Sequence, residues 1–229
     1  ALTVFAMPMI LGSFFQQVYN MADSIIVGQF VGSSALAAVG ACAALTNVFI
    51  CIALGAGVGA GVLVSRYFGA RDYSKMKTIV STSLISFLIL SILLGVFGFC
   101  FSHSMMRLLQ TPADILEAAV LYLRVYFVDF PFLFMYNILS TMFTSIGESK
   151  IPLGLLIFSS VLNIFMDLWM VAGLGLGVFG AALATLIAQG ISGVLSLLIF
   201  FSRMRRYKSH FAWFDGRELR SMLRIAVPS

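Results

Sequence analysis

Three aspartates, Asp23, Asp129 and Asp167, stand inside long apolar stretches of this 229-residue sequence. A carboxylate near the centre of a bilayer costs about 2.5 to 3.5 kcal/mol, so each of these groups needs something that neutralises its charge. Arg124 is five positions from Asp129, and this spacing turns the two side chains to different faces of a helix. We therefore expect a proton or a hard cation such as Na⁺, held by oxygen ligands. The alternative is that the carboxyl groups only hydrogen-bond helices together.

Other polar side chains recur around these aspartates in steps of three and four residues, which places them on one face of each helix. With a rise of 1.5 Å per residue, Asp23, Asn163, Asp167, Thr185 and Asp129 lie roughly 9 to 15 Å from the outer ends of their helices. We expect one polar layer there, in a cavity whose lining includes Gln16, Asn20, Asp129 and Gln189. The polar stripes are Ser13, Gln16, Gln17, Asn20, Asp23 and Ser24; Asp129, Tyr136, Asn137, Ser140 and Thr144; Ser160, Asn163 and Asp167; and Thr185, Gln189, Ser192 and Ser196.

The composition is that of a membrane protein. Hydrophobic residues make up 61% of the chain and charged residues 10%, whereas soluble domains carry about 25% charged residues. This balance excludes a cytosolic enzyme, a secreted disulfide scaffold and a disordered chain. The three cysteines, Cys42, Cys51 and Cys100, lie in apolar runs without metal-ligand spacing, and we interpret them as small core residues.

Six apolar runs are long enough to cross a bilayer as helices. Turn residues or charges separate them, so the sequence predicts an all-α, polytopic bundle of six transmembrane helices. The predicted spans are residues 2–31, 36–64, 78–101, 119–146, 151–172 and 178–201.

Lysine and arginine are distributed unevenly between the two sides of this bundle. If the first helix runs outward, the outer side keeps only Arg107 and Arg124, so both ends of the chain are predicted to be cytoplasmic. The inner side receives Arg66, Arg71, Lys75, Lys77, Lys150, Arg203, Arg205, Arg206, Lys208, Arg217, Arg220 and Arg224.

The motif Ala-x-Pro occurs at residues 6–8 and again at 226–228, after six predicted helices. This recurrence suggests that a second copy of the unit begins near the end of the sequence, as in a two-lobed transporter with parallel repeats. We accordingly expect a six-helix lobe at 1–201, a basic cytoplasmic linker between lobes at 202–220, and the start of a seventh transmembrane helix at 221–229.

Glycine and proline have separate predicted roles in these helices. Gly55, Gly57, Gly59 and Gly61 lie inside an apolar span, where a phosphate-binding loop has no place, so we interpret them as points of close helix packing. Pro8 and Pro131 remove backbone hydrogen bonds and permit bends. Pro8 is the candidate hinge that would respond to the charge state of Asp23.

Several of these residues resemble the multidrug and toxic compound extrusion (MATE) transporters. The most specific match is the run from Gly55 to Asp72, GAGVGAGVLVSRYFGARD, which is similar to the family's second helix and inner loop. In the first helix, Pro8, the segment Asn20-Met-Ala-Asp23 and Val27-Gly28 also match. The resemblance covers essentially the whole chain and implies the N-terminal six-helix lobe of a twelve-helix antiporter.

The resemblance implies export of drugs, often organic cations, against an inward flow of Na⁺ or H⁺. Asp23, Asn163, Asp167 and Thr185 match the family's cation site, for which Na⁺ is the candidate metal ion, and Asn137 is a further candidate for coupling. Asp129 matches no site of the family, whereas Pro8 matches its first-helix proline. The expected partners are the lipid bilayer, the drug substrate and a second lobe of the same polypeptide, in the inner membrane of a prokaryotic cell, with no organic cofactor.

Three rival functions each fit part of the sequence. A flippase for lipid-linked sugars would need several cationic residues to hold a pyrophosphate, and the polar stripes contain none apart from Arg124. An intramembrane aspartyl protease would need aspartates in Tyr-Asp and Gly-x-Gly-Asp motifs, which are absent from this sequence. The basic stretch from Arg203 to Lys208 fits an inner loop better than a nucleic-acid site. The flippase is therefore the main alternative, and no catalysis is expected.

Overall fold

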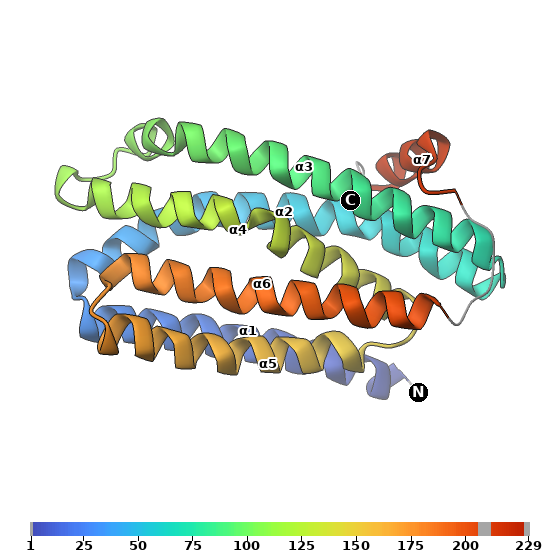
Figure 1. The fold of residues 1–229 in the computed structure, drawn as a ribbon, viewed down its shortest axis with the longest axis horizontal. Helices are drawn as coiled ribbons and strands as arrows, with labels where there is room; N and C mark the ends of the chain where they lie inside the picture. The colour runs from blue at the N-terminus through green and yellow to red at the C-terminus, as the bar shows by residue number, and fades with distance from the viewer. Residues whose placement is uncertain (1, 206–211, 227–229) are drawn as a thin grey trace.

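The computed structural model describes residues 2–205 and 212–226, and within these ranges every regular element is a helix (Figure 1). A π-helical segment, η1 (Leu168–Gly173), continues α5 directly. The fold is therefore the predicted all-α bundle. The helices are α1 (Leu2–Phe30), α2 (Ser33–Gly69), α3 (Tyr73–Leu108), α4 (Ala113–Ser145), α5 (Lys150–Asp167), α6 (Gly177–Met204) and α7 (Gly216–Ala226).

Five segments are long and apolar enough to cross a membrane: α2, α3, α4, α5 together with η1, and α6. The first predicted span, α1, has 29 residues and is about 44 Å long at 1.5 Å per residue, which exceeds the roughly 30 Å hydrocarbon core. One face of α1 carries a polar stripe that includes Gln16, Asn20 and Asp23.

Several helices continue past the apolar runs that predicted them. The stretch 102–117, expected to be a break, is largely helical because α3 extends to Leu108 and α4 begins at Ala113. A helix satisfies its own backbone hydrogen bonds, so leaving the hydrocarbon does not end it. The ends are set instead by local features such as Gly32, which adopts φ 108° between α1 and α2, and Asp72, whose carboxylate accepts a hydrogen bond from the Lys75 amide at the start of α3.

Helix α4 is central and packs against α2, α3 and α6. Figure 1 shows that α4 changes direction near its middle, where Pro131 interrupts the helix. A Cβ added at Gly61 would lie 2.7 Å from a Thr141 methyl carbon, and one at Gly57 would lie 3.3 Å from the Thr141 hydroxyl. The predicted close packing is confirmed at these two glycines, but Gly55 has open space around it.

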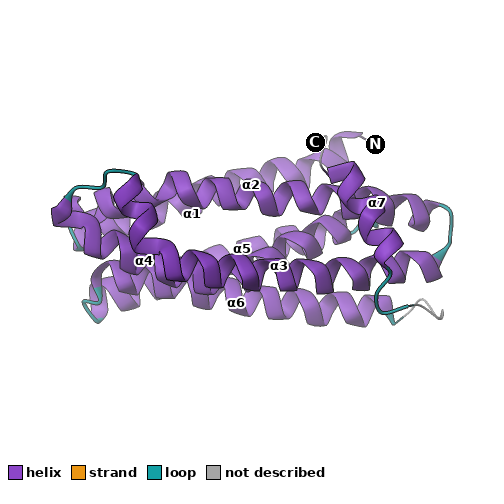
Figure 2. Cartoon of the chain, turned by 90° about the horizontal axis from the view of Figure 1, so that it is seen from above, coloured by secondary structure: helices purple, strands orange, loops and turns teal. Residues whose placement is uncertain are grey.

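The helices form two layers. α1 and α2 lie together behind the other helices in Figure 1 and along the upper row in Figure 2. α4 and α6 belong to the other layer, and α1 packs mainly against α5. Among the described residues, the apolar core forms three clusters. One lies around Phe143 and Phe200 toward the α4–α5 turn, one around Phe127 and Phe130 between α2, α3 and α4, and one around Val27 and Val178 beside the α1–α2 turn.

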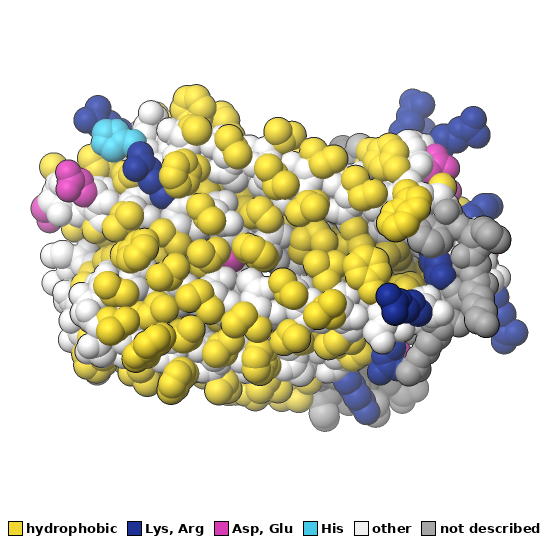
Figure 3. All heavy atoms as spheres, in the orientation of Figure 1, with side chains coloured by type: hydrophobic (Ala, Val, Ile, Leu, Met, Phe, Trp, Pro, Cys, Tyr) yellow, Lys and Arg dark blue, Asp and Glu magenta, His cyan; other side chains and the backbone are white. Residues whose placement is uncertain are grey.

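One end of the bundle, here called the basic end, is formed by the start of α1, the α2–α3 and α4–α5 turns and the end of α6. Figure 3 shows that lysine and arginine gather there, while hydrophobic side chains cover the middle of the visible face. The basic end holds Arg66, Arg71, Lys75, Lys77, Lys150 and Arg203.

Helix α7 lies across α2 and α3 at the basic end (Figure 2). Its apolar residues face the bundle, with Met222 buried, whereas Arg220 and Arg224 are exposed. Thr78 and Thr82 of α3 accept hydrogen bonds from the backbone amides of Ala212 and Asp215, which fixes the approach to α7. The division at 202–220 and 221–229 stays a prediction, because residues 206–211 and 227–229 lie outside the described ranges.

Candidate functional site

Four of the residues predicted to bind the coupling ion come together from three helices. Thr185 of α6 is the centre of this cluster: its hydroxyl donates to the Ala181 carbonyl at 3.2 Å and accepts from the Asn163 amide at 3.3 Å. The Tyr19 hydroxyl of α1 lies 3.4 Å from the same Thr185 oxygen. Because the Thr185 proton is directed to Ala181, Tyr19 donates this bond. The hydroxyl of Thr185 thus ties α1 and α5 to α6.

Beside this cluster, the carboxyl groups of Asp23 and Asp167 lie close enough for the charge of each to act on the other. Asp167 is fully buried, and neither of its oxygens has a hydrogen-bond partner in the described structure. The same holds for one oxygen of Asp23 and for the amide oxygen of Asn163. Four acceptor atoms thus converge without donors, an arrangement that is costly unless a positive charge or a proton joins it.

These oxygen atoms together are suited to bind a proton or a hard monovalent cation. Two carboxylates, an amide oxygen and a hydroxyl are all hard oxygen ligands, which suit Na⁺ and not a soft transition metal. The described residues contain no group of three or more histidine, cysteine or acidic side chains that could hold a metal ion. Two facing carboxyl groups can also share one proton, because both cannot be ionised at short range without repulsion.

A cavity of about 630 Å³ opens on the Asp23 side of the cluster. It lies between α1 and α2 on one side and α4 and α6 on the other, and its volume falls in the range of about 300 to 1,000 Å³ typical of ligand pockets. Its lining includes Asp23 but no lysine or arginine. The predicted cavity residues Gln16, Asn20 and Gln189 all line it. This acidic lining does not suit a pyrophosphate, so it does not favour the flippase.

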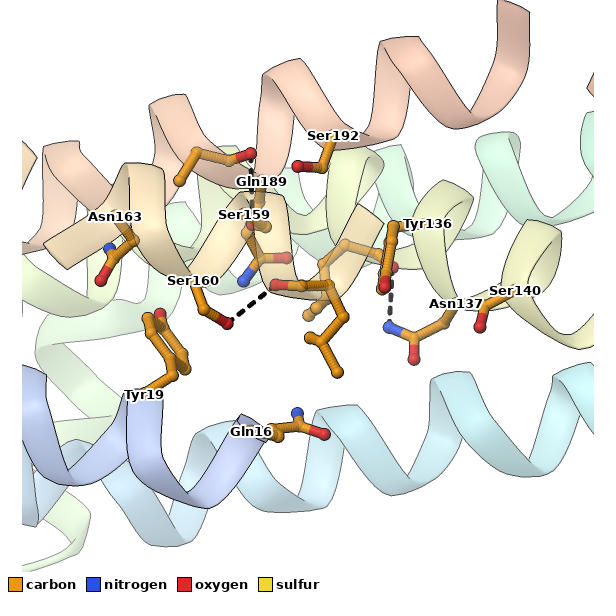
Figure 4. Close-up of a pocket in the computed structure, with 13 residues that line it drawn as sticks. Gln16, Tyr19, Tyr136, Asn137, Ser140, Ser159, Ser160, Asn163, Gln189 and Ser192 are labelled. Atoms are coloured by element: carbon orange, nitrogen blue, oxygen red, sulfur yellow. Dashed lines mark hydrogen bonds between the residues drawn. The ribbon is translucent and has the colours of Figure 1, made fainter. Parts of the chain in front are cut away.

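A second cavity, of about 170 Å³, lies between α1, α4, α5 and α6 (Figure 4). Ten of its thirteen lining residues are polar, and none is charged. Asn137, a candidate for ion coupling, lies in this smaller cavity, and its amide donates to the Leu133 carbonyl at 2.8 Å. Asn163, Tyr19 and Gln189 belong to its wall as well, so the smaller cavity meets the cluster around Thr185, here called the ion-binding cluster after the role predicted for it.

Asp129 occupies a different position from the one expected. It is buried, both carboxylate oxygens lack a partner among the described residues, and it is absent from the lining of both cavities. It lies on the same face of α4 as Tyr126 and Leu133, which do line the larger cavity. Asp129 is nevertheless close enough for its charge to act on the hydroxyls of Tyr126 and Tyr19.

Arg124 does not neutralise any of the three aspartates. Its Nε donates to the Ser102 hydroxyl of α3 at 3.2 Å, and its guanidinium lies 5.5 Å from the centre of the Phe99 ring. This placement agrees with the predicted difference in helix face between Arg124 and Asp129. Pro8 falls within α1, but its side chain lies outside the described residues, so its role as a hinge stays a prediction.

Sequence reasoning missed the tyrosines of this site. Tyr19 donates to Thr185, and Tyr122 and Tyr126 line the larger cavity. Tyr19 is four residues before Asp23, so the same helical spacing that selected Asn20 and Asp23 could have included it. It was passed over because an aromatic residue in an apolar run resembles ordinary core.

The MatE family model matches residues 8–169, which is more than half of the chain. The chain belongs to the MATE family. This match agrees with the glycine-rich run after Gly55 and with the first-helix residues around Asp23, and it confirms the family resemblance inferred from the sequence.

Similar proteins extend this match over the whole chain. The probable multidrug resistance protein YoeA of Bacillus subtilis (strain 168) is 30% identical over 240 residues, covering 100% of this chain and 51% of YoeA. The multidrug export protein MepA of Staphylococcus haemolyticus (strain JCSC1435) is 30% identical over 203 residues, which cover 89% of this chain and 45% of MepA. A crystal structure of MATE in the bent conformation superposes with a TM-score of 0.89 at 27% sequence identity, and the match covers 99% of this chain and 51% of the MATE chain.

The chain spans about half the length of the curated relatives that it matches. This proportion agrees with one six-helix lobe of a two-lobed MATE transporter. The chain is thus a multi-pass membrane protein of a transporter family with bacterial members.

Proposed function

We propose that this chain forms the N-terminal lobe of a cation-coupled multidrug antiporter, which exports organic cations by alternating access. The observation that carries the proposal is the group of unpartnered oxygens of Asp23, Asp167 and Asn163 beside a cavity of drug size. These oxygens attract a cation, and the adjacent cavity carries the same acidic character toward a cationic drug.

In the proposed cycle, Na⁺ or H⁺ enters from the side opposite the basic end and binds between Asp23 and Asp167. The bound ion cancels the negative charge that faces the larger cavity, so a cationic drug in that cavity loses a favourable interaction. Because the ion and the drug need the same charge, each weakens the binding of the other. Such competition couples inward flow of the ion to outward movement of the drug.

The proposed orientation places the basic end in the cytoplasm. Arg66, Lys150 and Arg203 lie at that end, together with the exposed arginines of α7, and positive residues are enriched in cytoplasmic loops. The start of α1 is then cytoplasmic, and the α1–α2 and α3–α4 turns face outward. The bilayer is the inner membrane of a prokaryotic cell, as the bacterial relatives suggest.

The experiment is efflux of a fluorescent organic cation from cells that express the full-length protein, with the Na⁺ and H⁺ gradients collapsed separately. We expect the wild type to export the dye and to need one of the two gradients, which identifies the coupling ion. Asp23→Asn and Asp167→Asn keep the side-chain size and remove the charge. Both should abolish gradient-driven export at normal expression.

Asp114→Asn is the matched control, because Asp114 is an exposed acid in the first turn of α4, away from the cluster. It should export like the wild type. Export that survives both Asp23→Asn and Asp167→Asn would refute this site as the place of coupling. Absence of export by the wild type would refute the antiporter and return the flippase for testing.

A further inference from the structure

The smaller cavity differs from the larger one in size and in chemistry. Its volume of about 170 Å³ is below the range of about 300 to 1,000 Å³ that is typical of drug-sized pockets. The volume is nevertheless large enough for several water molecules, since one water requires roughly 10 to 15 Å³. Its polar wall is made of hydroxyl and amide groups without charge. Such a lining supports water and a small cation, because hydroxyl and amide oxygens solvate a monovalent ion without trapping it.

The cavity begins at the ion-binding cluster and extends toward the basic end. Asn163, at one end, donates to Thr185, and Ser140, at the other, is five residues before the end of α4. At 1.5 Å per residue, Asn163 is about 20 Å and Ser140 about 8 Å from the ends of their helices at the basic end. Figure 4 shows Ser160, between these levels, on the wall contributed by α5.

Two buried groups of this region lack the partners that they need. The hydroxyl of Ser192, in the cavity wall, and that of Ser196, one turn closer to the basic end, are each 1% exposed and have no hydrogen-bond partner in the described structure. Buried hydroxyls without protein partners are normally satisfied by water. Beyond the cavity, Thr144 continues the polar face of α4, and Glu148 follows in the α4–α5 turn, 3.5 Å from Arg203.

From this geometry we infer that the smaller cavity is a hydrated passage by which the coupling ion leaves Asp23 and Asp167 and reaches the basic end. The inference rests on the proposed function, in which those two aspartates bind the ion. The drug and the ion then use separate compartments of one lobe. Gln16, Tyr19 and Gln189 line both cavities and form the boundary between them.

The first test is the reaction of an introduced cysteine with Ag⁺, a monovalent cation that binds thiolates. Ser192→Cys is made in the full-length protein, in a background where its native cysteines are replaced. The Ser192 hydroxyl has no hydrogen-bond partner in the described structure, so the substitution breaks no hydrogen bond to the protein. The matched control is Val194→Cys, two residues away on α6, where the side chain is 47% exposed on the apolar surface.

Ag⁺ is applied to membrane vesicles of either orientation, and unreacted cysteine is then labelled with a maleimide after denaturation. We expect Ser192→Cys to react from the cytoplasmic side at least about tenfold faster than Val194→Cys, because the hydrocarbon excludes an ion. Equal rates at the two positions would overturn the inference. Reaction from the outer side alone would also overturn it, since the cavity would then belong to ion entry.

A second variant tests the passage through transport. Ser192→Leu fills part of the cavity without touching the aspartates, and it should reduce gradient-driven export at least about tenfold while equilibrium binding of the dye is retained. Wild-type export by Ser192→Leu would overturn the inference. The two proposals can fail separately, because the Ag⁺ measurement does not depend on transport. If Asp23→Asn and Asp167→Asn leave export unchanged, the proposed function is refuted, whereas the rate of Ag⁺ reaction at Ser192→Cys is still decided by its own experiment.

Discussion

Thr185→Val removes the hydroxyl that joins the three helices of the proposed ion site while keeping the shape of the side chain. Two side chains lose their acceptor: the Tyr19 hydroxyl, at 3.4 Å, and the Asn163 amide, at 3.3 Å. Both distances are at the long end of the hydrogen-bond range, so each bond contributes about 0.5 to 1 kcal/mol. The freed donors turn to the carboxylate oxygens of Asp167, where they compete with the coupling ion.

The combined loss of about 1 to 2 kcal/mol corresponds to a 5- to 30-fold rise in the ion concentration that half-saturates export. The assay is gradient-driven export of the dye from proteoliposomes containing full-length protein, measured across a series of Na⁺ concentrations or pH values. Thr185→Ser retains the hydroxyl and should restore the wild-type value. This rescue separates the lost hydroxyl from a change in packing.

Thr46→Val is the matched control for this experiment. Thr46 also lines the larger cavity, but its hydroxyl donates to the Ala43 carbonyl of its own helix at 3.0 Å and does not meet the ion-binding cluster. It should leave the half-saturating concentration unchanged. If Thr185→Val lies within about twofold of Thr46→Val at equal reconstitution, the hydroxyl does not organise the ion site and the reasoning is refuted.

Three other substitutions, one of them paired with a control, test the packing and the remaining charges. Gly61→Ala places a methyl 2.7 Å from a Thr141 methyl carbon, which should lower the free energy of unfolding by about 1 to 3 kcal/mol and so lower the melting temperature of the purified protein. The control, Gly55→Ala, adds its methyl in open space and should leave the melting temperature unchanged. Equal melting temperatures of the two variants would contradict the close packing at Gly61. Asp129→Asn should retain gradient-driven export and thermal stability, because the Asp129 carboxyl group has no hydrogen-bond partner among the described residues. If export by this variant no longer depends on an ion gradient, Asp129 is part of the ion pathway. Arg124→Gln should leave the ion dependence of export unchanged, since its side chain points to α3, and a shift in that dependence would show that its charge reaches the site.

Much of the fold could be predicted from the sequence because the bilayer restricts what an apolar chain can do. Apolar runs of spanning length must form helices, so the membrane helices follow from hydropathy. The helix ends could not be found in this way, as α3 shows by continuing to Leu108. A helix can continue into residues outside the hydrocarbon at little cost in free energy, and it ends where local turn geometry prevents its continuation.

For the site, helical spacing predicted which polar residues share a face, and equal depth predicted that Asp23, Asn163, Asp167 and Thr185 meet. Spacing could not separate the two cavities, because that division depends on where helix packing puts Gln16, Tyr19 and Gln189, which line both. It also placed Asp129 in the cavity lining, whereas Asp129 is buried and lines neither of the two cavities. A face of a helix is about 100° wide, and neighbours within that width can line a cavity or support its wall.

The sequence alone therefore determined the all-α membrane fold, the family and the residues that carry charge into the interior. These properties depend on composition and on the period of one helix, which a chain carries before it folds. Only the tertiary structure decided that the Thr185 hydroxyl joins Tyr19 to Asn163, that Arg124 turns to Ser102, and that η1 begins directly after Asp167. Each of these depends on the rotation and distance of one helix against another, which side-chain packing fixes and hydropathy does not encode.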